Sequence, residues 1–170
     1  EAAEAAGAVA LLAPPGTTTS RPLVAAEDPS AALAVMAARF HPRQPAHIHA
    51  VTGTNGKSSS VEFLRQIWAA AGYQAAALGT LGVTRASGRV DVGFTTPDAI
   101  ALHRSLDQLA AEGVTHLAME ASSHGLKQRR MDGARLAVSG FTNLTQDHLD
   151  YHQTFEDYFD SKARLFTELT

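Results

Sequence analysis

The stretch AVTGTNGKSSS, at residues 50–60, decides the fold. An apolar run precedes it, and a run with the helical spacing of apolar residues follows it. A glycine-bearing turn between a strand and a helix is the setting in which a loop binds phosphate. Gly53 and Gly56 let the backbone turn with its N–H groups pointing inward. The loop and the N-terminus of the helix are therefore expected to form an anion cradle.

Two side chains after this turn suit phosphate chemistry. Lys57 would reach the β- and γ-phosphates of a nucleotide as a point charge, and the Ser58 hydroxyl would bind Mg²⁺. The strict P-loop pattern requires glycine where this chain has Val51, so only the second half of the pattern is matched. The alternative interpretation is a tight turn with a surface lysine, which the flanking strand and helix disfavour.

Strands and helices alternate along most of the chain. Apolar periodicity, glycine stops and N-cap residues predict these elements. The predicted strands span residues 48–52, 73–80, 115–120 and 136–142, with a hairpin-like excursion at 80–94, and the predicted helices span 58–71, 98–112 and 154–169. This order is typical of an α/β fold with a parallel sheet, in which ligands bind at the carboxyl ends of the strands.

Residues 1–45 follow a different pattern, with short apolar runs that are strand candidates and an N-capped, alanine-rich helix predicted at residues 31–40. The stretch HPRQPAH that follows is rich in proline, as linkers often are. We place a domain boundary near Gln44, which divides the chain into residues 1–45 and residues 46–170.

Composition limits the class of protein. Of the 170 residues 45% are hydrophobic and 18% charged, which indicates a globular domain. The net charge of -3 gives no general attraction for nucleic acid or anionic lipid, and the lack of cysteine excludes disulfides and thiolate zinc sites. The apolar stretch at residues 8–15 is too short to span a bilayer, and no basic segment of a signal peptide precedes it. We therefore expect a cytoplasmic protein.

Polar side chains follow the later predicted strands. Glu120 ends the strand at 115–120, where such folds hold a divalent cation beside the phosphate loop. The segment after the strand at 136–142 offers further oxygen and nitrogen ligands for Mg²⁺ or Mn²⁺. These are Asn143, Asp147, His148, Asp150 and His152. The alternative for Glu120 is a solvent-facing glutamate at a strand end.

The stretch ASSHGLKQRR, at residues 121–130, is expected to be one short loop, too polar for a core. Its arginines suit a phosphate or carboxylate ligand, although a solvent-facing basic loop is the ordinary alternative. Lys162 lies in the last predicted helix, where a lysine is usually solvated. The remaining histidines are expected to be structural or solvent-facing. They are His41, His47, His49, His103 and His116.

The motifs TGTNGKS, TTPD, MEASSHGLKQRR, FTNLTQDHLDYH and SKARLF, in this order, resemble those of the Mur ligases, most closely the MurE type. The resemblance covers nearly all of residues 46–170. Residues 1–45 resemble the end of that family's N-terminal domain. The resemblance implies that residues 46–170 are part of a P-loop central domain with a parallel sheet. It also implies that the C-terminal ligase domain is absent from this chain. We therefore expect the isolated chain to be an inactive fragment.

The resemblance also implies roles for individual residues. The ATP-binding positions are Gly53, Thr54, Asn55, Gly56, Lys57, Ser58, Ser59 and Asn143. The positions for UDP-muramoyl dipeptide are Thr95, Thr96, Ser122, Gln128 and Arg130. The metal positions are Ser58, Glu120, His148 and Lys162, the last as a CO₂-derived carbamate, and the catalytic positions are Lys57, Glu120, His148 and Lys162.

The implied activity is an ATP- and Mg²⁺-dependent amide ligase of peptidoglycan synthesis. It would activate the D-glutamyl carboxylate of UDP-MurNAc-L-Ala-D-Glu as an acyl phosphate and add an amino acid, with meso-diaminopimelate as our expectation. A sibling Mur ligase or a folylpolyglutamate synthetase is one alternative. A non-catalytic nucleotide-binding module is another. Neither a nucleic-acid partner nor membrane insertion is expected, and the oligomeric state is not predictable.

Overall fold

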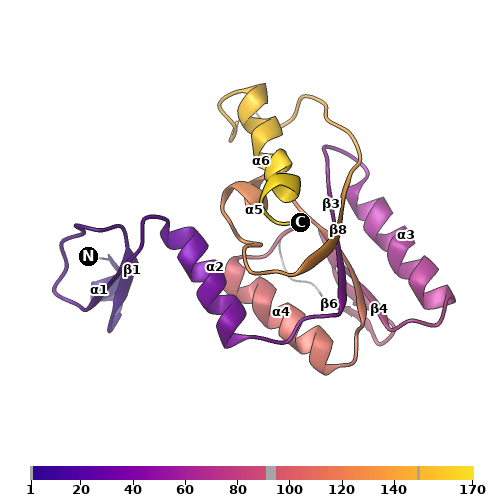
Figure 1. Ribbon diagram of the computed structural model, residues 1–170, viewed down its shortest axis with the longest axis horizontal. Helices are drawn as coiled ribbons and strands as arrows, with labels where there is room; N and C mark the ends of the chain where they lie inside the picture. The colour runs from indigo at the N-terminus through magenta and orange to yellow at the C-terminus, as the bar shows by residue number, and fades with distance from the viewer. Residues whose placement is uncertain (1, 91–94, 149) are drawn as a thin grey trace.

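The computed structural model describes residues 2–90, 95–148 and 150–170 of the chain (Figure 1). Its centre is a 6-stranded sheet. The strands are β3 (His47–Thr52), β4 (Ala75–Gly79), β5 (Gly82–Arg85), β6 (Gly88–Val90), β7 (His116–Glu120) and β8 (Leu136–Phe141). Their order is β6-β5-β4-β7-β3-β8, and the four strands from β4 to β8 pair in parallel. The other two, β5 and β6, extend the sheet as antiparallel strands.

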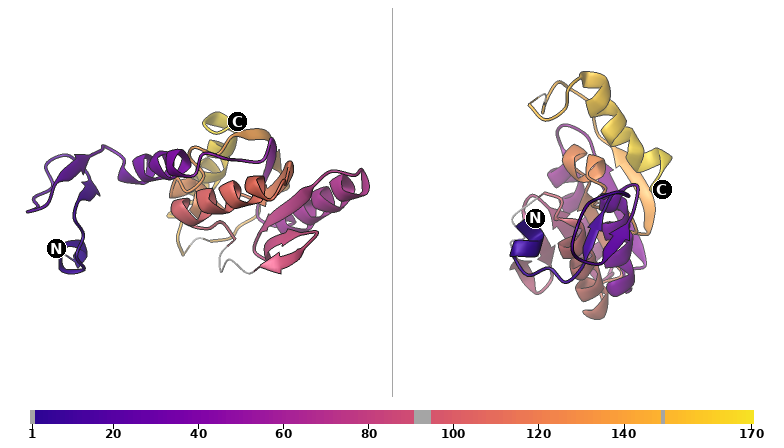
Figure 2. Two further views of the ribbon diagram at one scale, coloured as in Figure 1. Left: turned by 90° about the horizontal axis from the view of Figure 1, so that it is seen from below. Right: turned by 90° about the vertical axis from the view of Figure 1, so that its left-hand side faces the viewer.

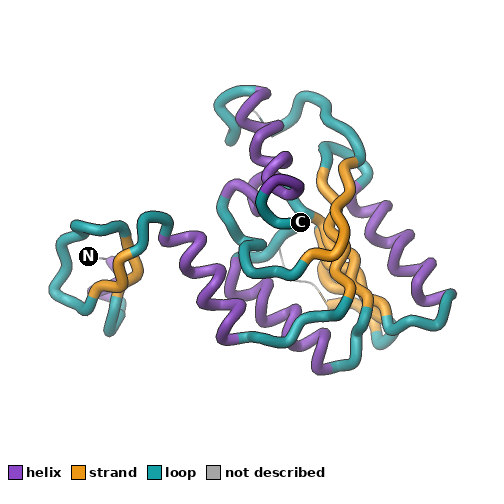
Figure 3. The backbone as a smooth tube through the Cα atoms, in the orientation of Figure 1, coloured by secondary structure: helices purple, strands orange, loops and turns teal. Residues whose placement is uncertain are grey.

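Helices cover both faces of this sheet (Figures 1 and 3). They are α3 (Lys57–Ala70), α4 (Ala99–Ala111), α5 (Ser123–Lys127) and α6 (Phe155–Thr167). Successive side chains of a strand point to opposite faces, so in β7 Ala118 packs with Val61 of α3 while Leu117 packs with Leu102 of α4. Leu165 of α6 joins the core on the α4 side. The helix α3 thus lies on one face, and α4, α5 and α6 lie on the other.

The first part of the chain precedes the central sheet. It contains α1 (Ala2–Ala5) and a parallel pair of strands, β1 (Leu11–Ala13) and β2 (Leu23–Ala25), followed by α2 (Pro29–Phe40). Figure 2 shows that the β1–β2 pair lies away from the central sheet, whereas α2 packs along α4. The predicted boundary near Gln44 falls between α2 and β3, and the division into two domains stays a prediction.

The predicted α/β fold is confirmed, with the difference that the sheet is mixed. The hairpin-like excursion forms β5 and β6, and residues 91–94 of that prediction lie outside the described residues. The expectation of a polar loop at residues 121–130 is wrong. Ser122 caps a short helix by accepting a hydrogen bond from the Gly125 N–H, and Leu126 is fully buried. Among the described residues no helix has the length and apolar composition to cross a bilayer.

Candidate active site at the phosphate loop

A polar cleft of about 240 Å³ lies where β3, β4 and β7 end beside the N-terminus of α3. The groups that line it come from distant parts of the chain. They are Thr54, Asn55, Gly56, Lys57, Ser58, Thr80, Thr95, Glu120, Ser122, Ser123, His148 and Lys162. Parallel strands bring their carboxyl ends to one edge of a sheet. Most residues predicted to bind phosphate or metal, or to act in catalysis, therefore share a single cleft.

The phosphate loop, residues 53–58, depends on its two glycines. Gly53 has φ +138° and Gly56 has φ +84°, values that residues with a Cβ rarely adopt. A Cβ on Gly53 would also lie 2.0 Å from Thr142 Oγ1, the hydroxyl of the residue after β8. Both glycines thus supply the backbone freedom that this turn uses, and at Gly53 a side chain would also collide with Thr142.

Asn143 supports the phosphate loop through hydrogen bonds to its backbone. Its carbonyl accepts a hydrogen bond from the Thr54 N–H at 2.9 Å, and its Oδ1 accepts one from the Asn55 N–H at 3.1 Å. Its Nδ2 donates back to the Asn55 carbonyl at 3.1 Å. Asn143 therefore supports the loop rather than lining the cleft, and Ser59, also predicted to bind ATP, is exposed on the first turn of α3.

The N-terminus of α3 differs from those of the other long helices. In α2, α4 and α6 an Asp or Thr side chain accepts a hydrogen bond from the first turn, which satisfies one of the free N–H groups. The N-cap of α3 is Gly56, and within the described part of the chain no side chain caps it. Free N–H groups at a positive helix end that opens into a polar cleft form a site for an anion.

Two lysines meet at the base of the phosphate loop. Lys57 Nζ donates to the carbonyl oxygens of Gly53 and Thr54, at 2.9 and 2.8 Å. Lys162 Nζ donates to the same Gly53 oxygen at 2.8 Å and lies 4.4 Å from the centre of the Tyr158 ring. Lys162 is only 1% exposed, so the expectation for a helix lysine on physical grounds, a solvated side chain, is wrong here.

Burial lowers the pKa of both amines. Desolvation lowers the pKa of Lys57, and Glu120 and Asp147 oppose this shift. Desolvation, with a smaller contribution from Lys57, lowers the pKa of Lys162 to about 8. A buried lysine of this kind releases its proton readily. Lys162 therefore has a larger neutral, nucleophilic fraction near neutral pH than a surface lysine has.

Glu120 presents a buried carboxylate to the cleft. It is 1% exposed at the end of β7. Thr80, directly after β4, donates its N–H to Oε1 at 2.9 Å and its hydroxyl to Oε2 at 3.2 Å. Gly79 leaves the space for this carboxylate, because a Cβ there would lie 2.0 Å from Oε1. The solvent-facing alternative for Glu120 is wrong.

The residues predicted to bind the muramoyl substrate lie together beside this carboxylate. Thr95 shares a hydrogen bond of 2.9 Å with Thr80. Thr96 donates its hydroxyl to the Glu120 carbonyl at 3.0 Å and accepts the Ser122 N–H at 3.1 Å. These contacts join the segment after residue 94 to the end of β7.

Gln128 and Arg130 extend the same group from the turn after α5. Arg130 donates to the Thr96 carbonyl at 2.6 Å and, through Nε and a terminal nitrogen, to Gln128 Oε1 at 2.9 and 2.6 Å. Gln128 donates to the Tyr151 hydroxyl at 2.9 Å. A guanidinium and an amide thus lie next to Thr96, at the side of the cleft, and do not themselves line it.

The histidines near the cleft differ in role. His148 lines the cleft with 45% of its side chain exposed and a positive φ of 53°. His152 is fully buried, and its Nε2 lies 2.9 Å from Ser123 Oγ. This places His152 in the packing between α5 and α6, so the prediction that it could be a metal ligand is wrong. His103 is also buried, bonded to the Asp132 carbonyl, as expected of a structural histidine.

The donor set fits a magnesium ion that takes part of its shell from phosphate. Within the described residues no group of three or more His, Cys, Asp or Glu side chains gathers, so a metal cage made entirely of such side chains is not found there. Ser58, Glu120 and His148 nevertheless line the same cleft. Mg²⁺ is commonly held by one or two carboxylates, waters and substrate phosphates, which matches a buried carboxylate facing a phosphate loop.

Three residues of the site were not predicted from the sequence. Thr80 holds Glu120, Ser123 lines the cleft, and Tyr158 bonds Thr54 Oγ1 at 3.1 Å while its ring faces Lys162. Thr80 could have been found, because it directly follows a predicted strand and so lies at the ligand-binding edge. Nothing in the pattern around Tyr158 distinguishes it from an ordinary core residue.

The sheet, its glycine loop and the uncapped helix define an α/β nucleotide-binding domain of the phosphate-loop class. The chain belongs to the Mur ligase family, because the family model described as the Mur ligase middle domain matches residues 51–170.

Relatives and solved structures agree with this assignment. The chain is 54% identical over 172 residues to a UDP-N-acetylmuramoyl-L-alanyl-D-glutamate–2,6-diaminopimelate ligase of Bradyrhizobium diazoefficiens, a match that covers 99% of this chain and 35% of the relative. It is 55% identical to the ligase of the same name of Chelativorans sp., again over 99% of this chain and 36% of the relative. The chain thus spans about a third of the length of these relatives.

A solved structure of a ligase of that name matches with a TM-score of 0.83 and 32% identity, over 97% of this chain and 34% of the other. FolC of E. coli, in a complex with DHPP and ADP, matches with a TM-score of 0.62 and 18% identity over 78% of this chain and 38% of that chain. At that identity the second likeness shows a shared fold alone.

Proposed function

We propose that this chain is the phosphate-binding part of an ATP-dependent ligase that joins an amino acid to UDP-MurNAc-L-Ala-D-Glu in bacterial peptidoglycan synthesis. The observation that carries the proposal is the uncapped N-terminus of α3, which opens beside Lys57 onto a cleft that also holds the buried carboxylate of Glu120. Such a site combines an anion cradle with groups that neutralise charge on a transferred phosphoryl group. The relatives' names supply the substrate class.

The reaction follows from the weakness of a carboxylate as an acyl donor. A carboxylate oxygen of the D-glutamyl residue attacks the γ-phosphorus of ATP, the bond from γ-phosphorus to the bridging oxygen breaks, and ADP leaves. The amine of the incoming amino acid then attacks the acyl carbon and displaces phosphate. Positioning and electrostatics provide most of the catalysis in such a transfer.

Different residues bind the phosphates, the muramoyl substrate and the metal ion. The free N–H groups of α3 and the Lys57 ammonium bind the phosphates, and Lys57 must turn from the carbonyls of its own loop to do so. Thr95, Thr96, Ser122, Gln128 and Arg130 hold the muramoyl substrate. Ser58, Glu120 and His148 would hold Mg²⁺, and the bound ion would supply neutralisation of the phosphate charge.

We propose that Lys162 works as a carbamate. Its amine is buried against Lys57, and both amines donate to one carbonyl, so the two positive charges repel each other. The ammonium first loses one proton to give the neutral amine, and addition of CO₂ to that amine, with loss of a second proton, gives the carbamate anion. The carbamate would then attract Lys57 and offer oxygen atoms toward the cleft that Lys162 lines.

The wider assignments rest on the relatives. Their names favour 2,6-diaminopimelate as the added amino acid. We propose that residues 1–45 end an N-terminal domain, that residues 46–170 form the first part of the central domain, and that further ligase domains complete the activity. ATP and a UDP-linked substrate are cytoplasmic metabolites, so we place the reaction in the cytoplasm.

The test is ADP release by the full-length protein that carries this chain, with ATP, Mg²⁺, UDP-muramoyl dipeptide and diaminopimelate. We expect release only with the dipeptide present, and a loss of at least 100-fold in Lys57→Ala, since single charge-stabilising groups contribute about that factor. Lys162→Ala should lose activity and regain part of it with added short-chain carboxylic acid. ADP release without the dipeptide would instead support a nucleotide-binding module, and release that depends on a folate would support the folate ligase alternative.

A further inference from the structure

The end of α5 has a conformation that its sequence does not favour. Arg129 follows the C-cap residue Gln128 and has φ +56°. The N–H groups of Arg129 and Arg130 donate to the carbonyls of Leu126 and Gly125, at 3.1 and 2.9 Å, which is the hydrogen-bond pattern of a Schellman motif. Glycine usually takes the left-handed position of this motif, because a Cβ disfavours that conformation. An arginine there needs contacts that stabilise it.

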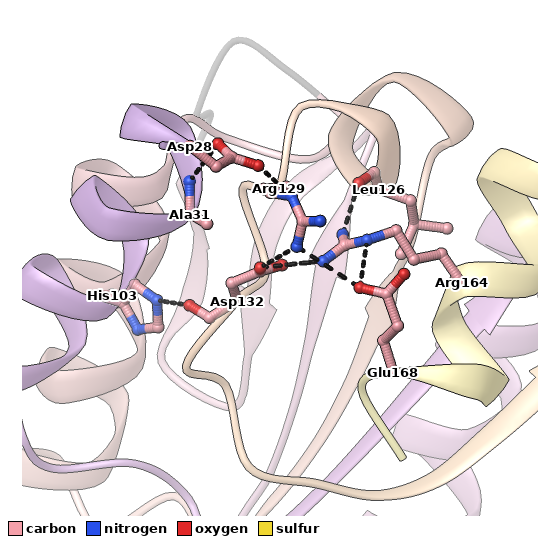
Figure 4. A network of polar contacts seen from close by, with 8 residues as sticks. All are labelled: Asp28, Ala31, His103, Leu126, Arg129, Asp132, Arg164 and Glu168. Carbon is pink, nitrogen blue, oxygen red and sulfur yellow. Dashed lines mark hydrogen bonds and ion pairs between the residues drawn. The ribbon is translucent and has the colours of Figure 1, made fainter. Parts of the chain in front are cut away.

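A charge network provides such contacts. We define it by Asp28, Arg129, Asp132, Arg164 and Glu168 (Figure 4). The Arg129 guanidinium lies 2.5 Å from Asp28 Oδ2, 3.1 Å from Asp132 Oδ2 and 3.4 Å from Glu168 Oε2. Three carboxylates from three segments therefore hold one side chain.

The second arginine of the charge network ties it to the body of the protein. Arg164 of α6 lies 2.8 Å from Asp132 and 2.8 Å from Glu168, and it donates to the Leu126 carbonyl in the last turn of α5 at 2.7 Å. The Asp132 carbonyl bonds the buried His103 of α4. Asp132 and Arg164 are largely buried, so their pairing is geometrically fixed rather than a loose surface contact.

The neighbours of Arg129 in the sequence, Gln128 and Arg130, make their hydrogen bonds outside the charge network. Arg130 bonds the Thr96 carbonyl, and Gln128 bonds Arg130 and the Tyr151 hydroxyl. The left-handed bend at residue 129 separates these directions, with one side chain in the charge network and two beside the cleft. A bend relaxed into ordinary helical or extended geometry would rotate Arg130 away from the Thr96 carbonyl and from Gln128.

We propose that Arg129 is a positioning residue for the substrate side of the cleft. The charge network holds the bend at residue 129, and the bend aims Gln128 and Arg130 at the muramoyl substrate. Asp28, the N-cap of α2, pairs with Arg129, so the orientation of Gln128 and Arg130 also depends on the segment before the central sheet. This inference rests on the proposed function, because it names residues that set the affinity for that function's substrate.

The test uses the full-length protein and compares Arg129→Ala with Arg129→Gly. Alanine disfavours the left-handed conformation and lacks the guanidinium, whereas glycine lacks the guanidinium but adopts the bend freely. Asp28→Asn, made alone and in the Arg129→Gly background, removes one charge and keeps an N-cap residue for α2. The readouts are KM for UDP-muramoyl dipeptide, KM for ATP and kcat.

We expect Arg129→Ala to raise KM for the dipeptide about tenfold, because alanine disfavours the left-handed conformation and has no guanidinium to hold it. Arg129→Gly should raise that KM at most about twofold, because glycine adopts this conformation without a penalty. Asp28→Asn should raise that KM about threefold in the wild type and leave it unchanged in the glycine background, as coupled residues do. KM for ATP should stay within about twofold throughout, which also shows that the variants fold.

Two results would overturn the proposal. Arg129→Gly could raise KM for the dipeptide as much as Arg129→Ala does, which would assign the effect to the guanidinium and not to the bend. Asp28→Asn could act equally in both backgrounds, which would separate Asp28 from Arg129. A wild-type protein without dipeptide-dependent ADP release would instead contradict the proposed function, so the two failures are distinguishable.

Discussion

Glu120 has its carboxylate at the end of β7, almost fully buried, with both oxygens bonded to Thr80. A buried carboxylate is costly unless hydrogen bonds or a cation compensate it. Gly79, on the adjacent strand, leaves the space that this side chain occupies, since a Cβ there would approach Glu120 Cγ to 2.6 Å. A residue that takes no part in the chemistry thus decides where a reactive group lies.

Gly79→Ala should therefore displace the Glu120 carboxylate while leaving the strand intact. We expect ADP release by the full-length protein to fall about 10- to 100-fold, the usual cost of moving a residue that supports a metal ligand. The matched control is Gly140→Ala in β8, where the new Cβ would meet only Val51 Cγ2, at an ordinary 3.8 Å. Equal activities of the two variants would contradict the role given to Gly79.

At the scale of elements, the register of β3 and β7 brings histidines together at the end of the sheet away from the cleft. His47 lies opposite His116 with ring centroids 4.5 Å apart, and His116 contacts the Tyr73 ring. His49 packs edge-on against Trp68 of α3. Burial is the first cause that lowers the pKa of His49 and of His116, and repulsion from neighbouring histidines adds to it.

These shifts predict a loss of stability in mild acid. A histidine whose pKa is lowered in the folded state takes up a proton more readily when unfolded, so stability is complete above the unfolded value of 6.5 and falls as the pH drops through it. Thermal unfolding followed by circular dichroism should show a lower midpoint at about pH 5.5 than at about pH 7.5. His116→Gln should reduce that difference, and an unchanged pH dependence would refute the assignment to this cluster.

Local patterns predicted most elements, because apolar periodicity and caps act over a few residues. The helix predicted at residues 98–112 is α4, in which Asp98 is the N-cap and accepts the Ala101 N–H, and β3 and β7 are the buried runs that the sequence displays. Contacts between distant residues were not predictable. The short helix α5 needs Leu126 in a core that other elements build, and the burial of Lys162 needs the carbonyl of Gly53, 109 residues earlier.

The candidate site was predictable where its residues share one loop or follow a strand. Lys57 and Glu120 could be selected on those grounds, and the resemblance to the Mur ligases selected His148 and Lys162. The partners that hold them could not be selected. Thr80 and Tyr158 are ordinary residues in the sequence, and only the fold makes them supports for Glu120 and Lys162.

On the scale of the whole molecule, one edge of the sheet carries the phosphate loop, a buried carboxylate and a buried amine, whereas the segment before β3 contacts Arg129, in the turn after α5, through Asp28. We propose that the described residues provide the phosphate-binding part of a reaction that needs a second substrate and an amine. The coverage of about a third of each relative agrees with an activity completed by other parts of the protein.

The most direct measurement follows an oxygen atom. The full-length protein is given UDP-muramoyl dipeptide labelled with ¹⁸O in the D-glutamyl side-chain carboxylate, together with ATP and diaminopimelate, and the phosphate released is analysed by mass spectrometry. Attack of this carboxylate on the γ-phosphorus predicts one ¹⁸O atom in each phosphate released from the fully labelled substrate. Phosphate without ¹⁸O, at a rate equal to amide formation, would contradict an acyl phosphate and with it the proposed use of the cleft.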